Sequence, residues 1–207
     1  QGAAEASGVG STEYSLSYFR DSQAFKILTL VELPHHGPLV GYATDNRDYA
    51  VTIVRNFLYS ALMALVWERL ANVANQGLAA IAAKSLKETR YHLRHSHDWL
   101  VRFGDGTIES AQRTQAALDY LVPFTQEFWL LTPYEAAAIA AGDAVDVRLL
   151  KDDWTQLVSQ AVDTAKLQMP VATGYVTQGK FGTHSEHLSY LLAEMQSLAR
   201  AHPEGVW

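Results

Sequence analysis

The stretch KETRYHLRHSHDWL, residues 87–100, holds the side chains of this sequence that are best suited to chemistry. It contains three of the eight histidines, and Glu88 precedes His92 by four residues, about one helical turn. Carboxylates and imidazoles at helical spacing can bind a transition metal. Glu88, His92 and His95 are therefore the candidate metal ligands of the chain.

A helical wheel places these three residues beside a buried face. The charged side chains of the segment fall together on one side, which we expect to face water: Lys87, Arg90, Arg94 and Asp98. Leu86, Leu93 and Leu100 form an apolar stripe, and Glu88, His92 and His95 follow a second stripe at its flank. A buried acid needs a partner. We therefore expect Glu88 to pair with Lys84 or with a histidine or arginine of a neighbouring helix.

The spacing argues against a complete di-iron site. Ferritin-like bundles hold two irons with inward glutamates and a Glu-x-x-His pair on each of two helices. Here the spacing is Glu-x-x-x-His, and the residue three after Glu88 is Tyr91. Residues 47–72, predicted to be a helix, have Ser60 and Ala64 at their centre, where a bridging glutamate would have to lie. We interpret Glu88, His92 and His95 as a degenerate metal site, a polar pair or interface in a bundle core.

The elements that position these residues are predicted to be helices throughout. Apolar residues recur at helical intervals, and no alternation of period two persists, so the chain belongs to the all-α class. The expected helices cover residues 21–33 (Asp21 as N-cap, Pro34 as stop), 47–72, 75–106, 107–131, 132–142, 146–170 and 183–200. The helix of 47–72 is apolar nearly all round, which is typical of a buried helix.

Local signals set several of the predicted boundaries. Pro123 predicts a kink within the fourth helix, and Pro133 marks the start of the next. Pro170 is expected to stop the helix before it. The pair Thr183 and Glu186 matches a capping box at the start of the last helix.

Composition limits the classes of function. The chain has 207 residues and a formal charge of −6, so it shows no electrostatic footprint for nucleic acid. It contains no cysteine, which excludes disulfides and thiolate metal sites and fits a cytoplasmic location. No charge-free apolar run approaches about 20 residues, so we expect no membrane span. Residues 1–12 are small, polar and Gly-rich and predict a flexible lead-in, followed by one domain over residues 13–207.

Two further features have competing interpretations. In QGKFGTHSEH, Lys180 and two glycines precede a helix N-terminus, which makes Lys180 a candidate for an anion site. The alternative is a loop whose glycines only permit tight turns. Phe124, Phe128 and Trp129 flank Pro123 and are expected to lie in the core or between subunits rather than to line a pocket.

Long stretches of the sequence resemble one protein family. AAIAAKSLKETRYHLRHSHDWLVRFGDGT and YVTQGKFGTHSEHLSYLLAEMQ are similar to the PaaC component of the phenylacetyl-CoA epoxidase complex. YFRDSQAFKILTLVELP and the final Trp207 after HPEG extend the resemblance from about Tyr18 to the end of the chain.

The resemblance implies a ferritin-like helical bundle and a part in the aerobic breakdown of phenylacetate. It implies a non-catalytic structural subunit with no cofactor of its own. The partners expected are a related catalytic subunit that carries the di-iron centre and a reductase with FAD and an iron–sulfur cluster, which together form the ring-1,2-epoxide of phenylacetyl-CoA.

The resemblance does not include the N-terminal helices of the family. Two alternative functions also agree with the sequence. Family members begin with a further pair of helices, so we expect an incomplete bundle that exposes part of residues 47–72 and favours self-association. The alternatives are an autonomous ferritin-like di-iron oxidase and a helical interaction protein without oxygen chemistry.

Overall fold

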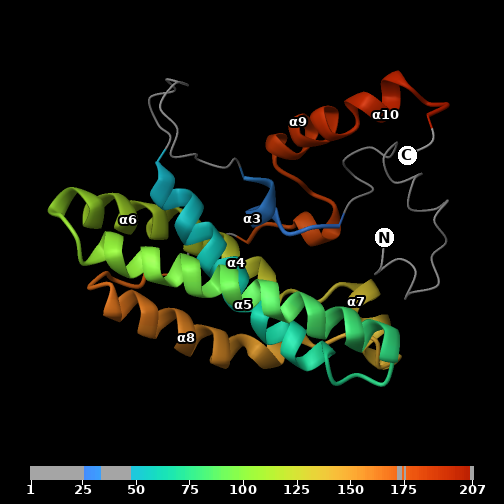
Figure 1. The fold of residues 1–207 in the computed structure, drawn as a ribbon, viewed down its shortest axis with the longest axis horizontal. Coiled ribbons are helices and arrows are strands. Elements are labelled where there is room, and N and C mark those ends of the chain that lie inside the picture. The colour runs from blue at the N-terminus through green and yellow to red at the C-terminus, as the bar shows by residue number, and fades with distance from the viewer. Residues whose placement is uncertain (1–25, 34–47, 172–173, 175, 206–207) are drawn as a thin grey trace. The chain divides into compact units, whose positions relative to one another are not determined.

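The computed structural model describes residues 26–33, 48–171, 174 and 176–205 (Figure 1). The chain divides into two compact units. The larger unit contains the described residues from 48 to 176, and the smaller one contains residues 26–33 and 177–205. The predicted lead-in of residues 1–12 lies outside the described residues, and the single domain over 13–207 stays a prediction.

The larger unit is a bundle of helices. Its elements in chain order are α4 (Tyr49–Leu70), α5 (Gln76–Gly104), α6 (Ile108–Leu121), the 3₁₀ helix η3 (Val122–Trp129), α7 (Pro133–Ala140), the 3₁₀ helix η4 (Val147–Leu150) and α8 (Lys151–Thr164). Helices α4 and α5 pack against each other along their length, and α6 and α8 each contact both of them. The described residues contain no β-strand, only an isolated bridge between Gln178 and Thr183. The predicted all-α class is confirmed.

Helix α4 is the centre of this core. Phe57, Leu58 and Ala61 are completely buried, and the indole Nε1 of Trp154 in α8 donates a hydrogen bond of 3.1 Å to the carbonyl of Leu58. By length and hydropathy α4 could also cross a membrane, but 61% of that window is buried within the protein. We interpret α4 as a core helix whose centre is covered by this chain, so the uncovered part expected within residues 47–72 does not include Phe57 or Leu58.

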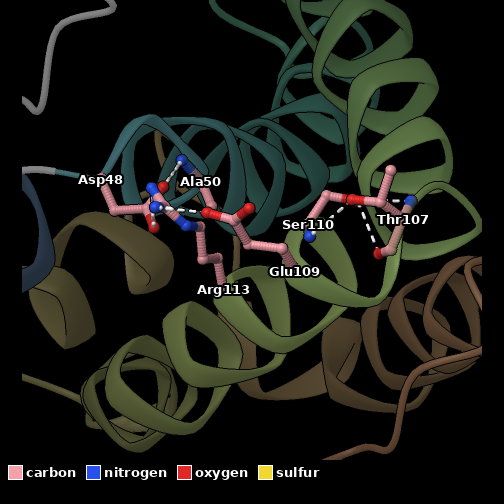
Figure 2. A network of polar contacts seen from close by, with 6 residues as sticks. All are labelled: Asp48, Ala50, Thr107, Glu109, Ser110 and Arg113. Atoms are coloured by element: carbon pink, nitrogen blue, oxygen red, sulfur yellow. Dashed lines mark hydrogen bonds and ion pairs between the residues drawn. The ribbon is translucent and has the colours of Figure 1, made fainter.

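Side-chain caps fix the starts of α4 and α6, as Figure 2 shows. Asp48 accepts a hydrogen bond from the backbone N–H of Ala50 at the start of α4. Arg113 of α6 forms ion pairs with Glu109 at 2.6 Å and with Asp48 at 3.6 Å. Figure 2 also shows Ser110 bonded to Thr107, the capping box that begins α6. These contacts join the start of α4 to the first turns of α6.

Two predicted helices differ from the structure in how they end. The fourth continues past Leu121 as the 3₁₀ helix η3, with Pro123 in its first turn, so the expected kink is a change of helix type. Helix α8 ends at Thr164, well before Pro170. Lys166 there takes a left-handed φ of 58°, and the N–H of Leu167 donates to the carbonyl of Val162. This closing turn ends the helix without proline.

The short helix α7 agrees with its local signals. Pro133 is its first residue, and Gly142 follows it with a φ of 80°. Thr132 and Glu135 form a capping box that the sequence also contains as T-x-x-E.

The smaller unit contains α3 (Thr29–Glu32), the 3₁₀ helix η5 (Gly179–Phe181), α9 (Glu186–Met195) and α10 (Ser197–Ala201). Asp21 and much of the helix predicted there lie outside the described residues. The predicted capping box of Thr183 and Glu186 is wrong, because Ser185 occupies the N-cap position of α9 and makes no side-chain cap. The hydroxyl of Ser185 instead bonds to Glu32.

Candidate functional site

A groove runs between α4 and α5 in the larger unit. Its volume is about 440 Å³. Its lining combines hydroxyls, an amide, imidazoles, one carboxylate and three large apolar or aromatic side chains: Asn56, Tyr59, Ser60, Met63, Trp67, Ser85, Glu88, Thr89, His92, His95 and Ser96.

The groove lies on the side of α4 that faces away from α8. Its lining residues on α4 recur at intervals of three or four residues, from Asn56 to Trp67, and so share one face of the helix. Leu58, whose carbonyl receives the Trp154 hydrogen bond, belongs to the opposite face. The groove therefore opens on the side of the α4–α5 pair that the described helices do not fill.

Small and neutral groups form much of the groove. Ser96 is buried, and its hydroxyl donates back to the carbonyl of His92 at 2.7 Å within α5. Burial raises the pKa of Tyr59, so its phenol stays neutral at ordinary pH and can both donate and accept a hydrogen bond. The groove thus offers polar contacts with little charge.

The structure brings Glu88, His92 and His95 to this groove but does not bury them. All three side chains are exposed. The Glu88 side chain forms no hydrogen bond or ion pair with another described residue. The predicted pairing with Lys84, or with a histidine or arginine of a neighbouring helix, is therefore wrong for the described part of the chain. The imidazole of His95 stacks on the ring of Tyr91 at a centroid distance of 6.3 Å. The wheel located the stripe correctly but placed it too deep, because the groove beside it is open.

The predicted solvent side of α5 agrees with the structure. Lys87, Arg90, Arg94 and Asp98 are exposed. Arg90 forms an ion pair of 2.6 Å with Glu68, near the end of α4. Glu68 is the one acid in the second half of α4, and it is not among the residues that line the groove.

The donor set of the groove does not suit a pair of irons. Glu88 is the one carboxylate in its lining, and α4 contributes Ser60 where a bridging glutamate would be needed. Across the part of the chain that the structure describes, no group of three or more His, Asp or Glu side chains is placed to hold a metal ion.

Lys180 belongs to the smaller unit, whereas the aromatic residues Phe124, Phe128 and Trp129 belong to the larger one. Lys180 lies in η5, is 7% exposed, and has interaction partners of its own. The anion site there stays a prediction. Phe128 is buried and meets Trp154 edge-on at 5.8 Å, which confirms the core interpretation for that residue. Phe124 and Trp129 are half-buried, and Trp129 also contacts Trp154.

Sequence reasoning missed the α4 side of the groove. Asn56, Tyr59 and Trp67 lie in a run that is apolar nearly all round, so no single face is distinguished by its pattern. The polar residues Asn56 and Ser60, four apart within that run, were the available signal.

Comparison with known proteins adds the family. The sequence profile of the family described as "Phenylacetic acid catabolic protein" (PaaA_PaaC) matches residues 1–207. The chain is 40% identical over 205 residues to a protein of Escherichia coli (strain K12) that is named as the C subunit of 1,2-phenylacetyl-CoA epoxidase. The match covers 99% of this chain and 78% of that protein. The helical architecture agrees with the ferritin-like fold expected of this family. The chain therefore belongs to the family of phenylacetic acid catabolic proteins.

Proposed function

We propose that this chain is a non-catalytic structural subunit of a multicomponent di-iron monooxygenase that epoxidises the ring of phenylacetyl-CoA. The observation that carries the proposal is the 40% identity, over 99% of the chain, to a protein named as a subunit of that epoxidase. A protein named as a subunit works within a complex of several chains. The proposed cellular setting is phenylacetate catabolism in the cytoplasm.

The chemistry of the groove supports the non-catalytic role. A di-iron centre requires several carboxylates from facing helices, and the groove between α4 and α5 offers Glu88 with His92 and His95. We propose that the irons belong to a related catalytic subunit, and that FAD and an iron–sulfur cluster belong to a reductase. This chain would supply a rigid helical wall that keeps the catalytic subunit's helices in register.

Iron content separates this proposal from an autonomous di-iron oxidase. The chain is expressed alone in iron-rich medium, purified without chelators and subjected to elemental analysis. We expect substoichiometric iron, because the groove offers one carboxylate. About two irons per chain would show a complete site of the ferritin-like kind and overturn the proposal.

Reconstitution tests the role within the complex. The chain is co-expressed with the catalytic subunit of the same organism, and the complex is assayed with the reductase, NADPH and phenylacetyl-CoA. We expect the two chains to co-purify and epoxide formation to require both. A double variant, Glu88→Ala with His92→Ala, should leave the rate unchanged. Loss of the rate in a complex that still assembles would assign catalysis to this chain. Failure to co-purify would favour an unrelated helical interaction protein.

A further inference from the structure

Glu32, the last residue of α3, is completely buried and is bound by the segment that begins α9. Its Oε2 accepts hydrogen bonds from the backbone N–H of Ser185 at 2.8 Å and from the Ser185 hydroxyl at 2.7 Å. Its Oε1 contacts Nδ1 of His184, whose side chain is 5% exposed. The Glu32 carboxylate lies in the N-terminal segment of the smaller unit. All three of these contacts come to it from residues of the C-terminal segment.

These contacts replace the usual cap of α9. Ser185 is the N-cap residue, but its hydroxyl makes no cap to its own helix. A serine in that position normally accepts a hydrogen bond from the second or third backbone N–H of the helix. Here the hydroxyl donates to Glu32 instead. A carboxylate at a helix N-terminus is favourably placed in the helix dipole, so Glu32 caps α9 from a distant part of the chain.

Two more contacts join the same segments. The Nζ of Lys26 donates to the carbonyl of Phe181 at 3.2 Å. A Cβ added to Gly179 would lie 2.3 Å from the carbonyl oxygen of Ile27, so the two backbones approach too closely for any other residue. Residues 26–32 therefore run alongside residues 179–185 in fixed register.

We propose that Glu32, His184 and Ser185 form a latch, the Glu32 latch, that keeps α9 docked on residues 26–33. A buried carboxylate is costly unless hydrogen bonds compensate it, and charge-assisted hydrogen bonds are roughly twice as strong as neutral ones. Both effects make the docking of α9 depend on the charged acceptor at position 32. The latch is a conformational device and does not rest on the function proposed above.

The latch has a specific dependence on protonation. A carboxylate offers only lone pairs, so Nδ1 of His184 carries the shared proton whether or not Nε2 is also protonated. Glutamine at position 32 keeps the shape but presents an NH₂ group that needs an acceptor. Neutral His184 can supply it through Nδ1 in its other tautomer, whereas protonated His184 has no acceptor. The Glu32→Gln latch would therefore hold only while His184 is neutral.

Other titratable groups of these two segments are shared by all variants. They are Lys26, Lys180, Glu186 and His187. Because they are unchanged when position 32 is substituted, a pH effect that appears only in Glu32→Gln reports on His184.

Hydrogen exchange tests the latch in the full chain. Protection of the α9 amides is measured relative to the α5 amides over a series of pH values, and the protonation state of the His184 imidazole is followed by NMR in the same samples. The variants are Glu32→Gln and Glu32→Ala, and the matched control is Glu194→Gln, an exposed acid in the second half of α9. Protection is corrected for intrinsic exchange at each pH.

We expect Glu32→Ala to lose at least about tenfold in relative α9 protection at every pH. Glu32→Gln should lose that much where the His184 imidazole is protonated and far less where it is neutral. Wild type and Glu194→Gln should show no such change with the protonation of His184. Wild-type α9 protection in Glu32→Gln with protonated His184 would overturn the latch, as would wild-type protection in Glu32→Ala or an equal loss in α9 and α5. If Glu32→Ala does not fold, the contrast between the two protonation states of His184 in Glu32→Gln decides the question.

Discussion

At the level of single residues, exposure separates side chains that look alike in the sequence. Glu88 and Glu32 are both acids on helices, yet Glu88 is exposed and Glu32 is completely buried with three donors around it. Glu88 is conspicuous in the sequence because histidines lie near it along the chain. Nothing near Glu32 in the sequence indicates its partners, which lie 152 and 153 residues away.

The first prediction concerns Glu88 itself. We expect Glu88→Ala to change the free energy of unfolding by less than about 0.5 kcal/mol, because an exposed side chain without a partner contributes little. Chemical denaturation of the variant and of wild type measures the difference. A loss of about 1–3 kcal/mol would show that Glu88 has a buried hydrogen-bond partner, and that the groove is closed in solution.

At the level of helices, α7 and α9 begin with different capping chemistry. Helix α7 starts at a complete capping box, in which the Thr132 hydroxyl accepts from the Glu135 N–H and the Glu135 carboxylate accepts from the Thr132 N–H at 2.8 Å. Helix α9 has no such box and depends on Glu32. The same T-x-x-E pattern occurs before both helices, so the pattern alone does not tell which cap forms.

The second prediction tests the α7 cap. Thr132→Ala removes the hydroxyl that satisfies the Glu135 N–H, and Thr132 is 4% exposed. We expect a loss of about 1 kcal/mol in the free energy of unfolding. Thr155→Ala, at an exposed position within α8, is the matched control and should stay within about 0.5 kcal/mol of wild type. Equal effects of the two substitutions would mean that the cap does not stabilise the protein.

For the molecule as a whole, apolar surface remains for a partner. Within the described residues, α9 and α10 leave four large apolar side chains substantially exposed: Tyr190 (74%), Leu191 (41%), Met195 (58%) and Leu198 (56%). Exposed apolar groups that lie close together along a segment are common at protein interfaces. They support association more directly than α4 does, because the centre of α4 is covered by this chain itself.

The third prediction concerns association. We expect the isolated chain to show a mass above 22.9 kDa by light scattering, rising with concentration, and to form a heavier complex with the catalytic subunit. Dilution should return the isolated chain towards the monomer mass. A monomer at all concentrations that stays unchanged on mixing would contradict the subunit role.

Local sequence was sufficient to predict the all-α class and the extent of the long helices. Helical periodicity and the types of the central α4 residues are local properties. The solvent side of α5 also followed from periodicity. Boundaries set by local caps, such as Pro133 and Gly142 around α7, were equally predictable.

Which polar residues are buried depends on the packing of distant segments and could not be predicted. Depth depends on what packs against a face, and a helical wheel gives direction without depth. For that reason Glu88, His92 and His95 are predicted on the correct stripe but too deep, at a groove that is open. The contacts of Glu32 could not be predicted for the same reason. Glu32 meets His184 and Ser185 only when residues 26–33 and 177–205 of the smaller unit fold together.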